Sequence, residues 1–427
     1  MPYRIAGIDV HKRMLAVVVS EVEVAGEYEF ERRKFGSNPA QLRLLADWLV
    51  EQGVEEVVME STAQHWKPVW GALERFWKPR TEKREDARIA SGTLHLAQAQ
   101  SNRAPRGRKN DFADAERLVK RLVAHELKLS FVPDAEQRLW RTLMRRKYQV
   151  TRNRVQLQNR LEALLEEAHL KLSSLVSDLL GVSARRMLRA VAEGAADPTA
   201  VAALAHAQLR ATPEQLRDAL GACAELNPVY RRLVGMALEE LDLIEKQIHQ
   251  LDQEMADRLH AYQDQVHRLA EVPGLGADSA QQIIAEVRVT AAAFPSEGDL
   301  ASWVGACPGE EETGGISRSH RSPKGNRHMR RILNQAANAA ARSKGSLFQI
   351  LYRRYVVRLG HNQTIGIIAH RLCRLIWKLL HQAVRYQERG PDAARRTKHK
   401  RTARMIRELR SLGYRVEPTP HPAGGVA

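Results

Sequence analysis

Short apolar runs alternate with polar stretches at the start of the chain. Residues 4–21 hold two runs rich in Ile, Leu and Val, and residues 27–35 alternate aromatic with polar positions. A two-residue periodicity is typical of strands, so we predict three antiparallel strands here. A short apolar run at 54–59 predicts a fourth, central strand, and residues 93–97 predict a fifth.

Three helices are predicted among and after these strands. Asn38 and Pro39 form a helix start, and apolar residues follow them at helical spacing. The second helix is expected at 67–76 and the third at 111–125. Antiparallel strands followed by alternating helices and strands are the order of the ribonuclease H-like fold, which we predict for residues 1–130.

The middle of the chain has helical periodicity. Uninterrupted patterns at 134–167 and 231–262 predict two long helices within a helical, coiled-coil region at 131–268. We expect these helices to pair with each other or with another subunit. The second helix carries an apolar heptad stripe of Leu241, Ile244, Ile248, Leu251 and Met255. We expect this stripe to meet a helix across a subunit interface, with packing inside one chain as the alternative.

The last third of the chain is predicted to be mostly helical. A domain at 269–390 contains a Gly-rich, basic loop at 305–326, and residues 391–427 form a basic tail that we expect to be disordered. The predicted fold class is therefore α/β plus all-α, with an N-terminal mixed domain, a long-helix linker and a helical C-terminal domain.

The charge of the chain restricts its partners. Lys and Arg number 67 against 50 Asp and Glu, a net charge of +17, which favours a polyanion such as nucleic acid. An anionic membrane is the alternative. However, the sequence has no apolar run of spanning length, signal peptide or lipidation motif, so we expect a cytoplasmic protein. We interpret the three cysteines (Cys223, Cys307 and Cys373) as reduced thiols.

Four acidic residues form a candidate metal site. Asp9 lies inside the first apolar strand, Glu60 ends the fourth, and Asp111 and Asp114 share one helix face. Taken singly, Asp111 could be only a helix cap, and Asp114 and Glu60 could be solvated surface acids. Asp9 differs, because a carboxylate inside an apolar strand needs a partner. Together, converging carboxylates suit Mg²⁺, with Mn²⁺ as the alternative, and two-metal chemistry at a phosphodiester.

A competing fold places an aspartate on the same strand. Sugar kinases and actin-like proteins open with Asp-x-Gly on their first strand and bind phosphate with a second Gly-rich loop. Here Gly7 precedes Asp9, and no second loop of that kind follows. The acidic pair at the start of a basic helix also fits nuclease chemistry better.

Two C-terminal segments could contact phosphate. Gly274 and Gly276 precede a helix whose N-terminal amides could hold a phosphate, although an ordinary turn between helices explains them equally well. The loop at 307–327 combines glycines and hydroxyls with four cations, Arg318, Arg321, Lys324 and Arg327. These cations could neutralise a phosphate beside an attacking hydroxyl; the alternative is a solvated loop that only contacts the nucleic-acid backbone.

An ordered set of short motifs resembles one known family. The motifs are GIDVHK at 7–12, MEST at 59–62, GRKNDFADA at 107–115, VPGLG at 272–276 and KGNRHMRR at 324–331. In this order they are similar to the transposases of the insertion-sequence-110 family, described as bridge-RNA-guided DNA recombinases. The resemblance covers nearly the whole chain before the tail.

This resemblance implies a fold and a set of partners. It implies a RuvC-like domain, a coiled-coil linker and a C-terminal transposase domain in a prokaryotic, nucleoid-associated protein. It also implies Mg²⁺, a structured non-coding guide RNA, a donor and a target DNA, and a homo-oligomer, dimeric or tetrameric.

The resemblance also assigns roles to residues. The family's DEDD tetrad falls on Asp9, Glu60, Asp111 and Asp114. Its nucleophilic serine follows an acidic residue, and the matching position here is Thr313. A threonine hydroxyl is capable of the same attack but is more hindered, and Ser317 lies close enough to replace it.

Two other functions remain open at this point. A RuvC-like junction nuclease would use water as its nucleophile and the C-terminal domain only for binding. An inactive, transposase-derived protein would bind nucleic acid without cutting it. Covalent protein–DNA adducts favour the recombinase, free 3′-hydroxyl ends favour the nuclease, and metal-independent binding without strand changes favours the third function.

Overall fold

The computed structural model describes most of the chain, in two compact units. The described residues are 3–22, 28–61, 63–78, 92–99, 110–308, 311–313, 316–319 and 322–411. The first unit spans Met1–Ala135 and the second Glu136–Ala427.

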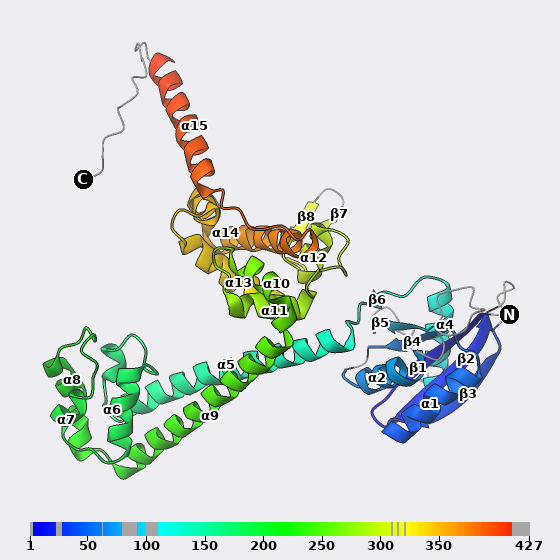
Figure 1. Ribbon diagram of the computed structural model, residues 1–427, viewed down its shortest axis with the longest axis horizontal. Coiled ribbons are helices and arrows are strands. Elements are labelled where there is room, and N and C mark those ends of the chain that lie inside the picture. Colours follow the sequence, from blue (N-terminus) through cyan, green and yellow to red (C-terminus); the bar gives the residue numbers. More distant parts are fainter. Residues whose placement is uncertain are drawn as a thin grey trace. The chain divides into compact units, whose positions relative to one another are not determined.

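A mixed sheet forms the centre of the first unit (Figure 1). Its strands are β1 (Tyr3–Val10), β2 (Met14–Val22), β3 (Phe30–Gly36), β4 (Glu56–Glu60), β5 (Thr93–Ala97) and β6 (Leu129–Ser130), in the order β3-β2-β1-β4-β5-β6. The first three strands are antiparallel, and β4 and β5 continue the sheet in parallel with β1. The five predicted strands are confirmed, and β4 is central. Strand β6 is too short for sequence periodicity to reveal.

Helices cover both faces of this sheet. Helices α1 (Pro39–Glu51) and α2 (Trp66–Phe76) pack on one face, where Ile8 and Met59 are buried with Leu45. Helix α4 (Asp111–Val123) packs on the other face, where Ile5 is buried with Val119. Side chains alternate between faces along a strand, so odd positions of β1 point toward α4. This alternation decides where Asp9 points.

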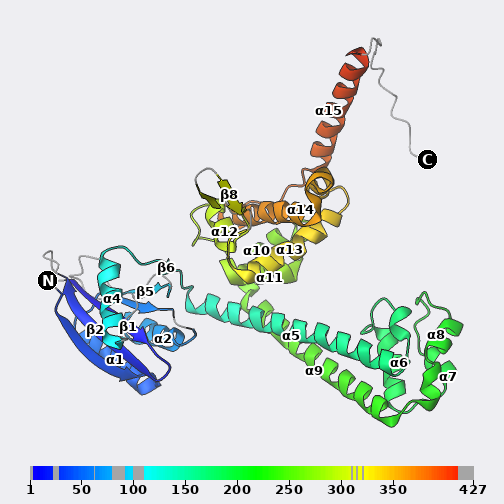
Figure 2. The same ribbon diagram turned by 180° about the vertical axis from the view of Figure 1, so that it is seen from behind.

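Two long helices of the second unit run side by side (Figures 1 and 2). They are α5 (Ala135–Glu167) and α9 (Pro228–Arg258), and Leu157 of α5 is buried in one cluster with Leu241 of α9. An ion pair between Arg154 and Glu245, at 3.2 Å, also joins them. Leu241 of the heptad stripe is therefore buried inside one chain, which is the alternative to the subunit interface that we had expected.

Short helices connect the far ends of this pair. They are η1 (Leu172–Ser174), α6 (Val182–Ala192), α7 (Pro198–Ala202), α8 (Pro213–Ala219) and η2 (Gly221–Glu225), and η3 (His260–Tyr262) follows α9. Pro198 and Pro213 each occupy the first turn of a helix, where the missing N–H costs nothing. These two prolines therefore mark the starts of α7 and α8.

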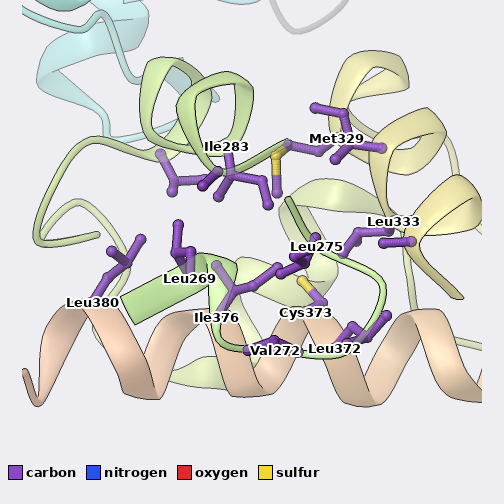
Figure 3. Close-up of a cluster of buried hydrophobic side chains, with 14 of the residues drawn as sticks. Leu269, Val272, Leu275, Ile283, Met329, Leu333, Leu372, Cys373, Ile376 and Leu380 are labelled. Carbon is purple, nitrogen blue, oxygen red and sulfur yellow. The ribbon is translucent and has the colours of Figure 1, made fainter. Parts of the chain in front are cut away.

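A second helical core lies in the C-terminal part (Figure 3). It consists of α10 (Gln263–Ala270), α11 (Ala277–Val287), α12 (Glu297–Val304), α13 (Arg327–Arg342) and α14 (Leu347–His381). Leu269, Ile283, Leu333 and Ile376 come from four of these helices and pack into one buried cluster. Within the described residues, no helix is both long and apolar enough to cross a membrane.

Two expectations for this part of the chain were wrong. The basic loop contains a two-stranded hairpin, β7 (Glu311–Thr313) and β8 (Ile316–Ser319). The tail was expected to be disordered from residue 391, but residues up to 411 form α15 (Gly390–Ser411). Ala, Arg, Lys and Leu are strong helix formers, and this propensity outweighs the polar composition of the segment. Residues 412–427 lie outside the described residues.

Candidate functional site

Asp9 is a buried carboxylate on the face of β1 that meets α4. It is 8% exposed and lies two residues after Gly7, on the same side of the strand. A Cβ on Gly7 would lie 2.3 Å from the carbonyl oxygen of Ala115 in α4. Glycine at position 7 therefore allows α4 to approach the strand closely, beside Asp9.

The N-terminus of α4 brings a second carboxylate to Asp9. Asn110 caps the helix, its side chain accepting a hydrogen bond from the Phe112 amide at 3.1 Å, and Asp111 is the first helical residue. The link between the two acids is His11, whose Nε2 lies 3.0 Å from Oδ2 of Asp9 and 3.2 Å from Oδ1 of Asp111. One ligand atom from each of these three residues lies within 4.8 Å of the other two.

His11 was not identified from the sequence. The sequence signal was weak, because His11 follows Asp9 by two residues but lies just beyond the end of β1 at Val10, where strand periodicity no longer fixes the face of a side chain. The His11 imidazole adds a nitrogen to the candidate ligands.

Glu60 lies on the strand next to Asp9. Ile8 of β1 pairs with Met59 of β4, so Asp9 and Glu60 follow at the next position of two adjacent parallel strands. Val58 is buried with Leu118 of α4, and Glu60, two residues later, occupies the same face. Glu60 thus lies on the same face of the sheet as Asp9, but it is not among the three residues whose ligand atoms converge.

Asp114 lies one turn further along α4. Its carboxylate forms an ion pair with Arg117 on the same helix. Like Glu60, it is not among the three residues whose ligand atoms lie within 4.8 Å of one another. The structure therefore groups Asp9 and Asp111 tightly with His11 and places Glu60 and Asp114 on the adjoining strand end and helix turn.

The ligand types of this cluster suit a divalent cation. Carboxylate oxygens are the ligands that Mg²⁺ and Mn²⁺ prefer, and an imidazole nitrogen is more compatible with the softer Mn²⁺. The side chains of Asp9, His11 and Asp111 already converge, so one ligand atom from each of them would hold a cation.

The hairpin carries the hydroxyl candidates. Thr313 ends β7, where it pairs with Ile316, and Ser317 of β8 pairs with Glu312. Arg318 also belongs to β8, whereas Arg321 lies outside the described residues. Lys324 and Arg327 are exposed beyond the hairpin, Arg327 as the first residue of α13.

Two glycines close the base of the segment that holds the hairpin. Gly305 has a φ of 70°, and a Cβ there would lie 2.5 Å from the carbonyl oxygen of Pro323. A Cβ on Gly325 would lie 2.4 Å from the Gly305 nitrogen. The Asn326 amide also donates to the Trp303 carbonyl at 3.1 Å. The two ends of this segment, at Gly305 and Gly325, therefore lie against each other beside the helical core.

A buried ion pair fixes the end of this segment. Glu286 is 2% exposed at the end of α11, and Arg145 of α5 donates to both of its oxygens at 2.9 Å. Asn326 donates to the same carboxylate at 2.8 Å. Although burial raises the pKa of Glu286, Arg145, Arg141 and Asn326 together hold it below its ordinary value. The carboxylate therefore stays ionised at neutral pH.

The two glycines before α11 differ in their surroundings. A Cβ on Gly274 would lie 2.3 Å from the Ala336 carbonyl oxygen of α13, so close helix packing requires this glycine. Gly276 is exposed at the start of α11, whose first turn carries Asp278, paired with Lys147. Helix packing thus explains Gly274 without a phosphate ligand.

Comparisons with known proteins point to one family. A transposase model of the DEDD IS110 type matches residues 6–170, and a model described as the transposase IS116/IS110/IS902 family matches residues 266–353. A Pseudomonas aeruginosa protein named as a family 20 transposase is 25% identical over 287 residues, covering 66% of this chain and 75% of the relative. A Sinorhizobium fredii protein named as a transposase is 25% identical over 289 residues, covering 66% of this chain and 64% of that relative.

Proposed function

The chain belongs to the IS110 family of transposases, and from this premise we propose that it cuts and exchanges DNA strands with its carboxylate cluster and its hairpin. The observation that supports this most directly is the convergence of Asp9, His11 and Asp111 within 4.8 Å. The cluster and the hairpin belong to the two separate segments matched by the family models. The two parts are complementary, because the carboxylate cluster offers no hydroxyl nucleophile, whereas the hairpin carries the hydroxyls of Thr313 and Ser317.

The carboxylates would hold the metal ions. Asp9 and Asp111 are the primary ligands, and Glu60 and Asp114 complete the tetrad from the adjoining strand and helix turn. Mg²⁺ is the proposed metal and Mn²⁺ the alternative. A bound metal would acidify the attacking group and stabilise the departing oxygen of a phosphodiester.

The hairpin would supply the nucleophile. We rank Thr313 first, because it occupies the family position at the end of β7, and Ser317 second, because a serine hydroxyl is less hindered. The hydroxyl oxygen would bond to phosphorus, one deoxyribose oxygen would leave with the proton, and the DNA would remain esterified to the protein. Arg318, Arg321, Lys324 and Arg327 would neutralise the phosphate.

Nucleic-acid partners follow from the family and the charge. The net charge of +17 supports contact with several nucleic-acid segments, which we propose are a donor DNA, a target DNA and a structured guide RNA. We also propose a homo-oligomer, dimeric or tetrameric, in which the hairpin of one copy could serve the carboxylates of another.

Trapping the covalent intermediate tests this function. The full chain, DNA carrying the ends of the element and RNA from its non-coding flank are incubated with Mg²⁺, and any protein–DNA adduct is mapped by mass spectrometry. We expect an adduct at Thr313, lost in Thr313→Ala and retained in Thr313→Ser. Full recombination by Thr313→Ala would eliminate Thr313 and promote Ser317. Cleavage without any adduct between residues 313 and 322 would favour the hydrolytic nuclease.

A further inference from the structure

A cationic cavity lies in the C-terminal helical core, away from the hairpin residues. It has a volume of about 580 Å³, within the roughly 300–1,000 Å³ of small-molecule sites. Its walls come from the start of α12, the first turn and the second half of α14, and the linker at residues 382–389 that leads to α15. Neither the carboxylate cluster nor the hairpin contributes to it.

The cavity lining has an excess of positive charge. Five basic side chains and one carboxylate line it. The basic residues are Arg371, Arg374, Lys378, Arg385 and Arg389. Arg374 and Lys378 share the carboxylate of Glu297, whose Oε1 accepts from Arg374 Nε at 2.9 Å and whose Oε2 lies 3.1 Å from Lys378 Nζ. Arg385 turns toward Asp264 and Glu271 outside the cavity lining. With Arg385 set aside, the lining therefore has four cations and one carboxylate, and only Arg374 and Lys378 pair with that carboxylate.

The floor of the cavity is apolar. Phe348 and Leu379 are buried in the helical core beneath it, and Leu375 is partly buried against that core. A phosphate alone would use only the cations and leave this floor in contact with water. A ligand that carries both a negative charge and a flat apolar group would use both parts.

The linker wall is held firmly in place. Glu388 accepts hydrogen bonds from the Leu347 amide at 2.9 Å, the Gly390 amide at 2.7 Å and the Tyr386 hydroxyl at 2.8 Å. A Cβ on Gly390 would lie 2.0 Å from the Gly345 carbonyl oxygen, so the linker packs directly on the turn before α14. The cavity is therefore formed before any ligand arrives, which lowers the entropic cost of binding.

We propose that this cavity binds one unpaired nucleotide of a single-stranded nucleic acid, its phosphate against Arg371 and Arg389 and its base on the apolar floor. The cavity is too small for a duplex, and a paired base could not reach the floor. An acidic peptide would match the cations, but the base explains the apolar surface as well. The inference rests on the nucleic-acid partner of the proposed function and not on its cleavage chemistry.

Binding measurements on the full chain without metal test the proposal. Fluorescence anisotropy in EDTA compares a labelled thymidine strand of about 12 nucleotides, the matching uridine strand and a duplex. The cavity variant is Arg371→Glu/Arg389→Glu. The control, Arg342→Glu/Arg353→Glu, changes the same charge at exposed positions of α13 and α14 outside the cavity lining. Thermal melting verifies that both variants fold.

The expected result is specific to single strands. The cavity variant loses about tenfold or more in affinity for one or both single strands, the control loses much less, and the two variants bind the duplex equally. Comparing the thymidine and uridine strands tells whether DNA or RNA fills the site. An abasic strand should bind the wild type more weakly than the thymidine strand, and the cavity variant should not distinguish them.

Several outcomes would overturn the proposal. Equal losses in the cavity and control variants would mean a general electrostatic effect. Equal losses on single strand and duplex, or full competition by a poly-glutamate peptide, would exclude an unpaired nucleotide, as would failure of the wild type to bind single strands. Because these measurements are made without metal, loss of binding at this cavity and loss of Mg²⁺-dependent cleavage are separate results.

Discussion

The side-chain amide of Asn326 donates a hydrogen bond to the carboxylate of Glu286 across 2.8 Å, and this contact ties the end of the hairpin segment to α11. The same carboxylate receives Arg145 from α5, so three distant parts of the second unit meet at one buried charge. The position of the hairpin's base therefore depends on an ion pair in the core.

Replacing Glu286 should destabilise the second unit strongly. Glu286→Gln leaves the arginines without their buried counter-charge, and breaking a buried pair costs about 3–5 kcal/mol. Urea denaturation measures the loss. The matched control is Glu240→Gln, which breaks a more exposed pair with Arg160 and should cost about 1 kcal/mol or less. Equal losses in the two variants would contradict the role of burial.

Glu286 should also make stability dependent on pH. Its partners hold its pKa below the ordinary value in the folded state despite burial, so folding favours the ionised form. This contribution is complete above the ordinary glutamate pKa and is lost as the pH falls through the lowered pKa. Melting temperatures measured from pH 7 down to acidic pH should therefore decline less steeply for Glu286→Gln. Parallel declines would show that Glu286 does not contribute.

Metal binding should depend on both carboxylates and on His11. Asp9→Asn should abolish Mg²⁺-dependent strand cleavage and leave the melting temperature nearly unchanged. His11→Ala should weaken Mn²⁺ binding by about tenfold, as the loss of a supporting group near a metal does. Isothermal titration with Mn²⁺ measures binding independently of activity. Unchanged Mn²⁺ affinity in both variants would remove the metal assignment from this cluster.

The close approach of α4 to β1 should make Gly7 intolerant of any side chain. A methyl group there would meet the Ala115 carbonyl and the Val119 side chain, so Gly7→Ala should destabilise the first unit by about 1–3 kcal/mol. It should also weaken Mn²⁺ binding, because α4 carries Asp111. The control is Gly71→Ala in α2, where a Cβ meets nothing within 4 Å and should be neutral or stabilising. Chemical denaturation distinguishes the two.

The helix pair α5–α9 should be stabilised by its internal stripe. Leu241 is 1% exposed and Leu243 is 55% exposed on the same helix. Leu241→Ala should cost about 2–5 kcal/mol, whereas Leu243→Ala should stay within about 0.5 kcal/mol. Urea denaturation at two protein concentrations tests this. A concentration-dependent effect of Leu241→Ala would restore the stripe to a subunit interface.

Local periodicity was sufficient to predict most elements of the first unit. Residues 93–97 were predicted as a strand with the bounds that β5 has, and Asn38 was identified as the start of α1, which it caps. These features depend on spacing of two or three to four residues, which a sequence displays directly.

The remaining features depend on contacts between distant residues. His11 could be recognised as part of the cluster only once α4 was placed against β1, since its second partner, Asp111, is far away in sequence. The partner of the α9 stripe was ambiguous because an apolar stripe does not specify whether its partner lies in the same chain. The cavity near Arg371 could not be recognised in the sequence, because its lining residues come from α12, both ends of α14 and the linker at residues 382–389.

The contact between Gly305 and Gly325 makes the hairpin segment an exchangeable part of the protein. Because its two ends already touch, the segment contributes one fixed pair of attachment points to the core whatever its length. Related proteins could lengthen, shorten or replace residues 306–324 and keep the same helical core. A change in the proposed nucleophile, such as threonine in place of serine, would then require no adjustment in the helical core. Evolution can therefore alter the side chains of the hairpin without changing the contacts at Gly305 and Gly325 that hold it to the core.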